Sequence, residues 1–155
     1  MATSRIPAAI TALVALWQAA PGLAGVTVVD GPPTSDQSDP DYVYVGWQTG
    51  EDAAAEMAQN FANAGARSRD ETFDILCQTD SFTGDADVAA RRTRAFQLLA
   101  AIEDSLRATG AAPSAPTLGG AVLWAHLTQA RLIQRNTDQG VQVGIAFRIS
   151  CHARI

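Results

Sequence analysis

The sequence predicts an α+β fold: one domain, residues 1–155, with an antiparallel β-sheet, two α-helices packed on one face of the sheet, and a long C-terminal β-hairpin. Three observations lead to this prediction. Side chains in the closing run, 141–155, alternate between apolar and polar, as in a strand with one buried face. Two separate segments repeat apolar residues at helical spacing. Short runs of β-branched and aromatic residues, bounded by Gly, Pro and Asp, lie between those segments.

The first helix is expected close to the N-terminus. Ser4 is a suitable capping residue, Pro7 fits the opening turn, and Pro21 and Gly22 should end the helix. Apolar residues recur between these points at helical spacing, and the apolar run is short and interrupted. We therefore expect neither a signal sequence nor a membrane span, but a cytoplasmic start and no membrane partner.

The next segments predict strands, with one ambiguous stretch. Residues 26–30 and 42–47 are short and β-branched or aromatic, and a Gly, Pro, Ser and Asp-rich loop separates them. Residues 48–66 contain helix-favouring alanine and glutamate but lack an apolar stripe. We interpret 48–66 as either an extended arm or the outgoing half of a hairpin. Residues 71–82 predict the third strand.

The clearest helix follows the third strand. We expect Asp85 to cap its N-terminus and Gly110 to end it. Its apolar stripe consists of Val88, Ala95, Leu98, Leu99, Ile102 and Leu106.

The final hairpin joins residues 121–134 to 141–155 across the turn "RNTDQG". Its apolar side should lie under the helices, because an antiparallel sheet commonly buries one face. The opposite side should carry four arginines: Arg131, Arg135, Arg148 and Arg154.

Both cysteines, Cys77 and Cys151, fall in the apolar phase of predicted strands. Two cysteines in a chain of this length do not form a disulfide framework. We expect reduced thiols in the core, and a disulfide between neighbouring strands is the alternative.

Catalytic signatures are weak. His126 and His152 could lie on adjacent strands, but their spacing fits no metal-ligand pattern. Cys77 paired with a histidine would be a thiol nucleophile only if it were exposed. The chain has no lysine, no phosphate-binding loop and no G-x-S-x-G motif. We expect no enzyme activity, no cofactor and no metal; a small intracellular enzyme using His126 and His152, or a module that binds a small ligand between helices and sheet, remains open.

Charge is unevenly distributed along the chain, whose net charge is −5. Residues 1–66 carry one arginine and seven acidic residues, whereas residues 105–155 carry five arginines and one aspartate. The acidic total argues against free DNA binding. Acidic and basic surfaces of this kind can meet between neighbouring copies in a head-to-tail ring, or both can be solvated surface.

Several blocks together resemble the tail terminator (tail completion) proteins of long-tailed bacteriophages. These blocks are an opening helix, "VVDGPP" with "PDYVYVGW", "GARSRDETFDILCQ", "RRTRAFQLLAAIEDSLR", and "GVQVGIAFRISCHARI" after "LTQARLIQRNTDQG". The resemblance covers nearly the whole chain, and it depends on the order and spacing of the blocks because the family has no catalytic signature.

The resemblance implies a structural virion protein. Family members form a homo-hexameric ring that caps the tail tube, ends its polymerisation and provides a docking surface for the head-tail connector. Expected partners are thus further copies, the tail tube protein and connector proteins, with passing contact with phage DNA in the lumen. The expected location is the tail-neck region of the virion, and the host cytoplasm during assembly; another neck component of the same fold is the alternative.

A ring also suggests which residues form its contacts, because each copy then needs two complementary surfaces. Candidates on the basic surface are Arg131, Arg135, Arg148 and Arg154. Candidates on the acidic surface are Asp36, Asp39, Asp41, Glu51 and Asp52.

Overall fold

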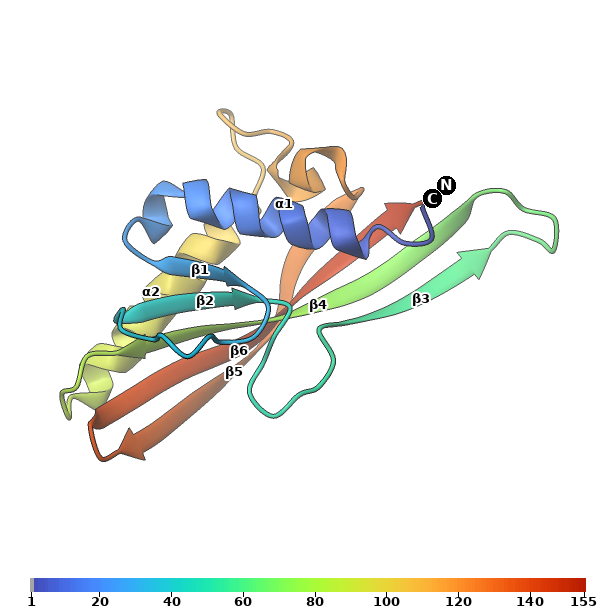
Figure 1. The fold of residues 1–155 in the computed structure, drawn as a ribbon. Helices are drawn as coiled ribbons and strands as arrows, with labels where there is room; N and C mark the ends of the chain where they lie inside the picture. Colours follow the sequence, from blue (N-terminus) through green and yellow to red (C-terminus); the bar gives the residue numbers. More distant parts are fainter. Residues whose placement is uncertain (1) are drawn as a thin grey trace.

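One six-stranded sheet organises the chain, and its strand order is β1-β2-β4-β6-β5, with β3 pairing to β4 off this path. The structure is a computed structural model that describes residues 2–155 (Figure 1). The strands are β1 (Thr27–Asp30), β2 (Asp41–Val45), β3 (Ala55–Phe61), β4 (Arg69–Phe82), β5 (Trp124–Thr137) and β6 (Gly140–Arg154). The helices are α1 (Ile6–Ala19) and α2 (Val88–Ser105), with short 3-10 turns at Pro21–Leu23 and Ala115–Gly120. The predicted α+β class and the long C-terminal hairpin are confirmed.

Both helices pack on the same face of the sheet. The odd-numbered side chains of β6, from Val143 to Cys151, are buried with the inward residues of α1 and α2 in one core cluster. Trp17 of α1 contacts Phe147 of β6, with their ring centroids 6.0 Å apart. We call the opposite side of the sheet the open face. The alternation predicted for the last strand is therefore confirmed, with its apolar side under the helices.

Strand β4 pairs with two strands along a single edge. Its C-terminal half pairs with β2 in the register Val45↔Cys77, and its N-terminal half pairs with β3 in the register Ala55↔Ile75. Residues 48–66 thus contain the outgoing strand of a hairpin, which resolves the two interpretations left open. We call β3 and the β4 residues paired with it, joined by residues 62–68, the arm. It projects from the body of the molecule (Figure 1).

The sheet differs from the predicted all-antiparallel arrangement at one edge. Strand β1 pairs with β2 in parallel, from Thr27↔Tyr42 to Asp30↔Val45. The loop 31–40 carries the chain back to the starting end before β2 begins, so both strands run in the same direction. This edge has four residue pairs, and β1 also contacts α1.

The N-terminus of α2 also differs from the prediction. Its cap is Asp87, whose side chain accepts a hydrogen bond from the Ala90 N–H at 3.0 Å, so the prediction of Asp85 is wrong. Asp85 stabilises the preceding turn, where its carboxylate accepts from the Asp87 N–H at 3.2 Å. The helix ends at Ser105, before Gly110. The predicted apolar stripe is confirmed at its centre, where Ala95, Leu98, Leu99 and Ile102 are buried.

Replacing Leu98 should destabilise the fold far more than the same replacement at the surface. Leu98 is 0% exposed and Leu123 is 51% exposed. We expect Leu98→Ala to lower the free energy of unfolding by about 2–5 kcal/mol, because it leaves a cavity in the core. Leu123→Ala is the matched control and should cost much less. Urea denaturation of both variants checks this, and equal losses would contradict the proposed core.

Candidate interaction surface

The open face carries all four predicted basic residues. In β6, Arg148 and Arg154 alternate with the core-facing residues. In β5, Arg131 pairs with Ala146 and Arg135 pairs with Gln142, which places both on the open face too. A bulge between Leu127 and Gln129 shifts the phase of β5, and the arginines follow that bulge. The structure therefore brings the four arginines to one side of the sheet.

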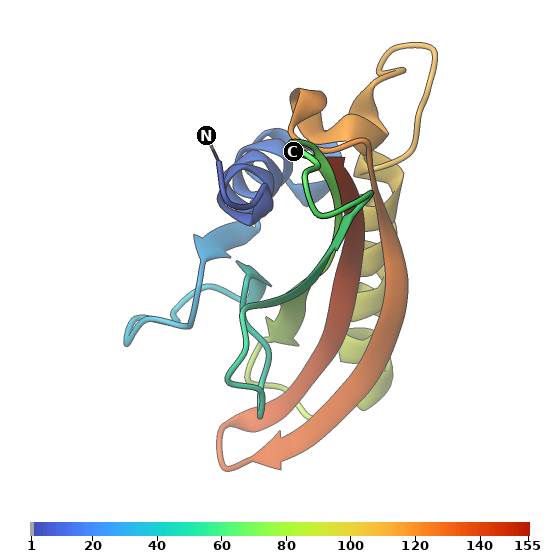
Figure 2. The ribbon, with the colours of Figure 1, turned by 90° about the vertical axis from the view of Figure 1, so that its right-hand side faces the viewer.

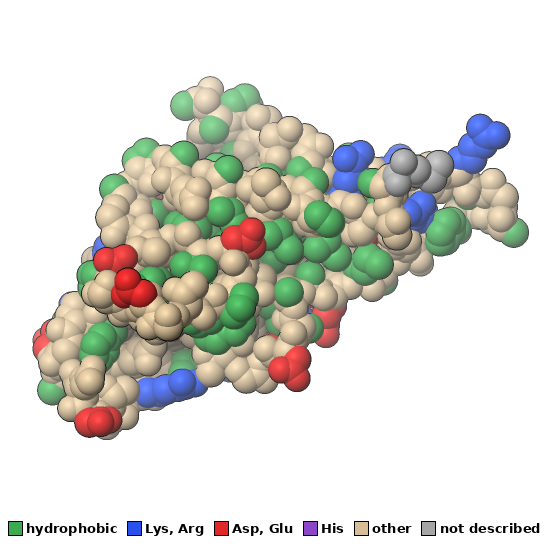
Figure 3. Space-filling model, viewed as in Figure 1, with side chains coloured by type: hydrophobic (Ala, Val, Ile, Leu, Met, Phe, Trp, Pro, Cys, Tyr) green, Lys and Arg blue, Asp and Glu red, His purple; other side chains and the backbone are tan. Residues whose placement is uncertain are grey.

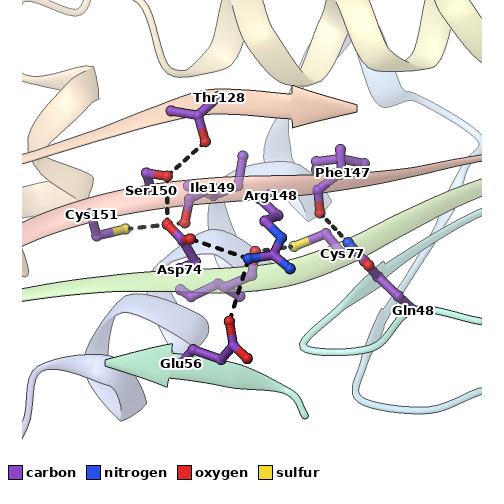
Figure 4. A network of polar contacts seen from close by, with 11 residues as sticks. Gln48, Glu56, Asp74, Cys77, Thr128, Phe147, Arg148, Ile149, Ser150 and Cys151 are labelled. Atoms are coloured by element: carbon purple, nitrogen blue, oxygen red, sulfur yellow. Dashed lines mark hydrogen bonds and ion pairs between the residues drawn. The ribbon is translucent and has the colours of Figure 1, made fainter. Parts of the chain in front are cut away.

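Arg148 is held within the chain by a polar network (Figure 4). Its Nη1 lies 3.4 Å from Glu56 Oε2 on β3 and 3.5 Å from Asp74 Oδ2 on β4. Asp74 Oδ1 also accepts from the Ser150 hydroxyl at 2.5 Å, and Ser150 is 2.6 Å from the Thr128 hydroxyl at the bulge of β5. This network connects four strands across the open face.

Arg154 is likewise paired inside the chain. Its guanidinium donates to both carboxylate oxygens of Asp70, at 2.9 and 3.3 Å. This hydrogen bonding lowers the pKa of Asp70 below its ordinary value. His152 Nε2 lies 3.5 Å from the same carboxylate. Arg148 thus holds the base of the arm to β6, and Arg154 holds β4 to β6 near the loop 62–68.

Arg131 and Arg135, unlike Arg148 and Arg154, form no ion pair inside the described part of the chain. Within residues 2–155, neither has an acidic partner within 4.0 Å, and both are exposed. Arg131 lines an open hollow of about 210 Å³ together with Gln48, Glu51 and Arg148. Both guanidinium groups are accessible to another molecule, although the charge of Arg135 also acts on Asp80, beside which it lines a small hollow.

The loop between β2 and β3 forms one wall of that hollow. Gln48 is buried and its amide donates to the Phe147 carbonyl at 2.6 Å, while the Thr49 N–H donates to Gln78 Oε1 at 2.8 Å. These two bonds hold the loop over the open face. Glu51 and Asp52, which follow in this loop, are exposed.

The predicted acidic residues do not all share one environment. Asp36 and Asp39 are exposed in the loop between β1 and β2. Asp41 is 7% exposed, and its carboxylate accepts from Arg94 and from Ser81, each at 2.8 Å. The structure thus places Asp41 in an internal contact with α2, whereas Asp36, Asp39, Glu51 and Asp52 are accessible. Sequence reasoning missed the contact between Asp41 and Arg94 because the two residues are 53 positions apart.

Sequence reasoning also missed a buried carboxylate on the open face. Asp80 accepts from the Gln78 amide at 2.8 Å, and its burial raises its pKa above the ordinary value. A Cβ at position 144 would collide with its Oδ1, so glycine there leaves room for the carboxylate in this position. Asp80 borders a cavity of about 340 Å³ beside the stacked rings of Tyr42 and Tyr44. Alternation of β4 predicted which face Asp80 occupies but gave no sign of its burial.

The histidines and cysteines show no arrangement typical of catalysis. The Trp124 ring centroid lies 5.2 Å from that of His126 and 5.7 Å from that of His152. Among the described residues, no group of three or more His, Cys, Asp or Glu side chains is placed to hold a metal ion. Cys77 and Cys151 are free and buried, and burial raises the pKa of each to about 12. The prediction of reduced core thiols is confirmed.

Comparisons with known proteins give a likeness in fold. No family model and no curated protein matches the sequence. The structure matches a chain from a solved structure described as "Virion of native gene transfer agent (GTA) particle". The TM-score is 0.56 at 14% sequence identity, and the match covers 98% of this chain and 100% of the other. The two chains therefore share a fold along their whole length.

No helix in the described part of the chain has the length and hydropathy needed to cross a bilayer.

Replacing Asp80 should change how stability depends on pH. The folded chain retains a proton on Asp80 at pH values where the unfolded chain has lost it, because the folded-state pKa is raised. Stability contributed by this group is therefore complete below the ordinary aspartate pKa and is lost as the pH rises through the raised pKa. We expect Asp80→Asn, which keeps the acceptor for Gln78, to gain stability over the wild type as the pH rises from 4 to 8.

Urea denaturation across this pH range measures the effect. Asp138→Asn removes an exposed carboxylate from the same cavity rim and is the control for the loss of one negative charge. A difference between Asp80→Asn and the wild type that stays constant with pH would contradict the assignment.

Proposed function

We propose that this chain is a structural virion protein that forms a hexameric ring on the tail tube, ends tube polymerisation and provides the docking surface for the head-tail connector. The observation that carries the proposal is the fold likeness, which spans 98% of this chain and all of a chain from a virion. The order of the sequence blocks supports the more specific role as a tail terminator. The proposal includes no catalytic step, cofactor or metal.

The two sets of accessible charges fit this role. A ring repeats one heterologous contact, so each copy presents two different surfaces that complement each other. Arg131 and Arg135 belong to one surface, and the exposed loop residues Asp36, Asp39 and Asp52 belong to the other. Glu51 lines the same hollow as Arg131 and is therefore not counted on the second surface. Arginine suits interface ion pairs because its guanidinium binds carboxylates in a fixed geometry.

The proposed partners are further copies of the chain, the tail tube protein and head-tail connector proteins. DNA would pass through the lumen of the ring. The proposed location is the neck of the virion, after assembly in the host cytoplasm. Another neck component, such as a connector subunit of the same fold, is the alternative, since the matched chain is described only as part of a virion.

Electron microscopy of lysates in which this gene is interrupted tests the role directly. We expect tail tubes of uncontrolled, excessive length without attached heads, because nothing would stop polymerisation. Tails of normal length lying apart from filled heads would support the connector alternative instead. Normal infectious particles would contradict both roles. Supplying the intact gene in trans is the control and should restore normal particles.

Charge reversal at Arg131 should block assembly and leave the subunit folded. Arg131 is exposed and has no acidic partner within 4.0 Å in residues 2–155, so Arg131→Glu breaks no internal ion pair. We expect a wild-type melting temperature and at least a tenfold loss of particles in complementation.

Arg107→Glu is the matched control. Arg107 is also exposed, but it lies just beyond α2 and pairs with Glu103 of that helix, so its reversal should change stability little and leave assembly intact. If the Arg131→Glu variant assembles normally, Arg131 does not belong to the interface.

A further inference from the structure

We infer that β3 of one copy pairs with β5 of the next, so that the sheets of neighbouring copies join into one continuous antiparallel sheet. This inference rests on the proposed ring and specifies how its subunits are held together. The partner is a second copy of this chain.

The first argument is that two long strands have an unpaired edge. Within residues 2–155, β5 pairs only with β6, and β3 pairs only with β4. Strand β5 has 14 residues and β3 has seven. Each therefore presents a row of backbone N–H and C=O groups that another strand can bind. The remaining edge strand, β1, has four residues.

The second argument is strand direction. Strand β3 is antiparallel to β4, β4 is antiparallel to β6, and β6 is antiparallel to β5. It follows that β3 and β5 run in opposite directions. When the next copy is placed beside the first in the same orientation, as a cyclic ring requires, its β3 is antiparallel to the neighbouring β5. The contact is heterologous and repeats without inverting any subunit.

The third argument is that the two edges match on both faces. On the helix side, β3 exposes Met57 and Phe61, at 51% and 57%, and β5 exposes Leu132 at 40%. On the open face, β3 carries Glu56, and β5 carries Arg131 and Arg135. Apolar side chains therefore meet apolar ones, and an acidic side chain meets basic ones. Figure 3 shows apolar side chains exposed on the arm.

The arm is also fixed in place before any partner binds. Glu71 of β4 is fully buried and accepts from the Arg5 N–H at the start of α1 at 2.8 Å. Arg69 donates to the Thr3 carbonyl at 2.9 Å, and Arg148 lies within ion-pair distance of Glu56. A strand that is already ordered loses little entropy when it pairs.

Paired cysteines test the contact. Met57→Cys is combined in turn with Ala130→Cys, Leu132→Cys or Gln134→Cys, which all lie on the helix side of β5. Strands β3 and β5 of one chain are three strand spacings apart, roughly 14 Å, so a disulfide within one chain is excluded. The native Cys77 and Cys151 are buried and do not compete.

We expect at least one combination to give a ladder of disulfide-linked multimers on a non-reducing gel after mild oxidation. Met57→Cys with Ile133→Cys is the matched control, because Ile133 lies on the open face and its thiol would point away from Met57→Cys. The variants are oxidised both as purified chain and in particles made by complementing the interrupted gene.

The outcomes separate this inference from the proposed function. The edge pairing is overturned if rings or normal particles form but no helix-side cysteine pair cross-links. It is also overturned if the control pair cross-links equally. In both cases the capping role stands. Helix-side cross-links together with normal tails in the interrupted strain would support the joined sheet and overturn the capping role. A chain that shows no cross-link in solution or in particles overturns the inference.

Discussion

The antiparallel pairing of β4 with β6 is the constraint on which the rest of the structure depends. It runs from Asp70↔Arg154 to Phe82↔Gln142 and fixes which side chains face the helices. A shift of one residue would exchange the apolar and polar faces of both strands, so the core strongly specifies the register. The outer edge of β4 then receives β2 and β3, and the outer edge of β6 receives β5. Both faces of the sheet, and the long edges at β3 and β5, follow from this one pairing.

The open face combines polar groups that stabilise the subunit with groups that remain accessible. Arg148 and Arg154 form ion pairs that are partly exposed to solvent, and such pairs contribute little stability individually. Their geometric effect is larger, because they connect β6 to both strands of the arm. Burial of Asp80 instead destabilises the subunit at neutral pH, because it disfavours the ionised carboxylate. The accessible charges of Arg131 and Arg135 lie on β5, at the other edge of the same face.

The sequence predicted those elements whose periodicity reflects burial on one side only. The closing strand and the stripe of α2 were clear because Phe147 and Leu98 lie on faces that pack against the core. The outgoing strand of the arm was ambiguous because most of its side chains are exposed on both faces, which removes the alternation. The parallel direction of β1 depends on how a loop returns, and no local pattern encodes that. The four arginines were predicted on one face, but their division into paired and accessible side chains depends on Glu56, Asp70 and Asp74, which lie far away in sequence.

A long unpaired edge is a risk for uncontrolled association, and the chemistry of both edges limits that risk. The bulge in β5 interrupts its ladder, and Arg131 and Arg135 repel a second β5 edge. Glu56 similarly disfavours the approach of another β3. Contacts between like edges therefore place like charges together, whereas the β3 to β5 contact places opposite charges together. The edges thus discriminate against two-fold pairing and favour a repeating head-to-tail contact. Figure 2 shows that β5 and β6 bend along their length. A head-to-tail contact of this kind closes into a ring when the rotation between copies permits.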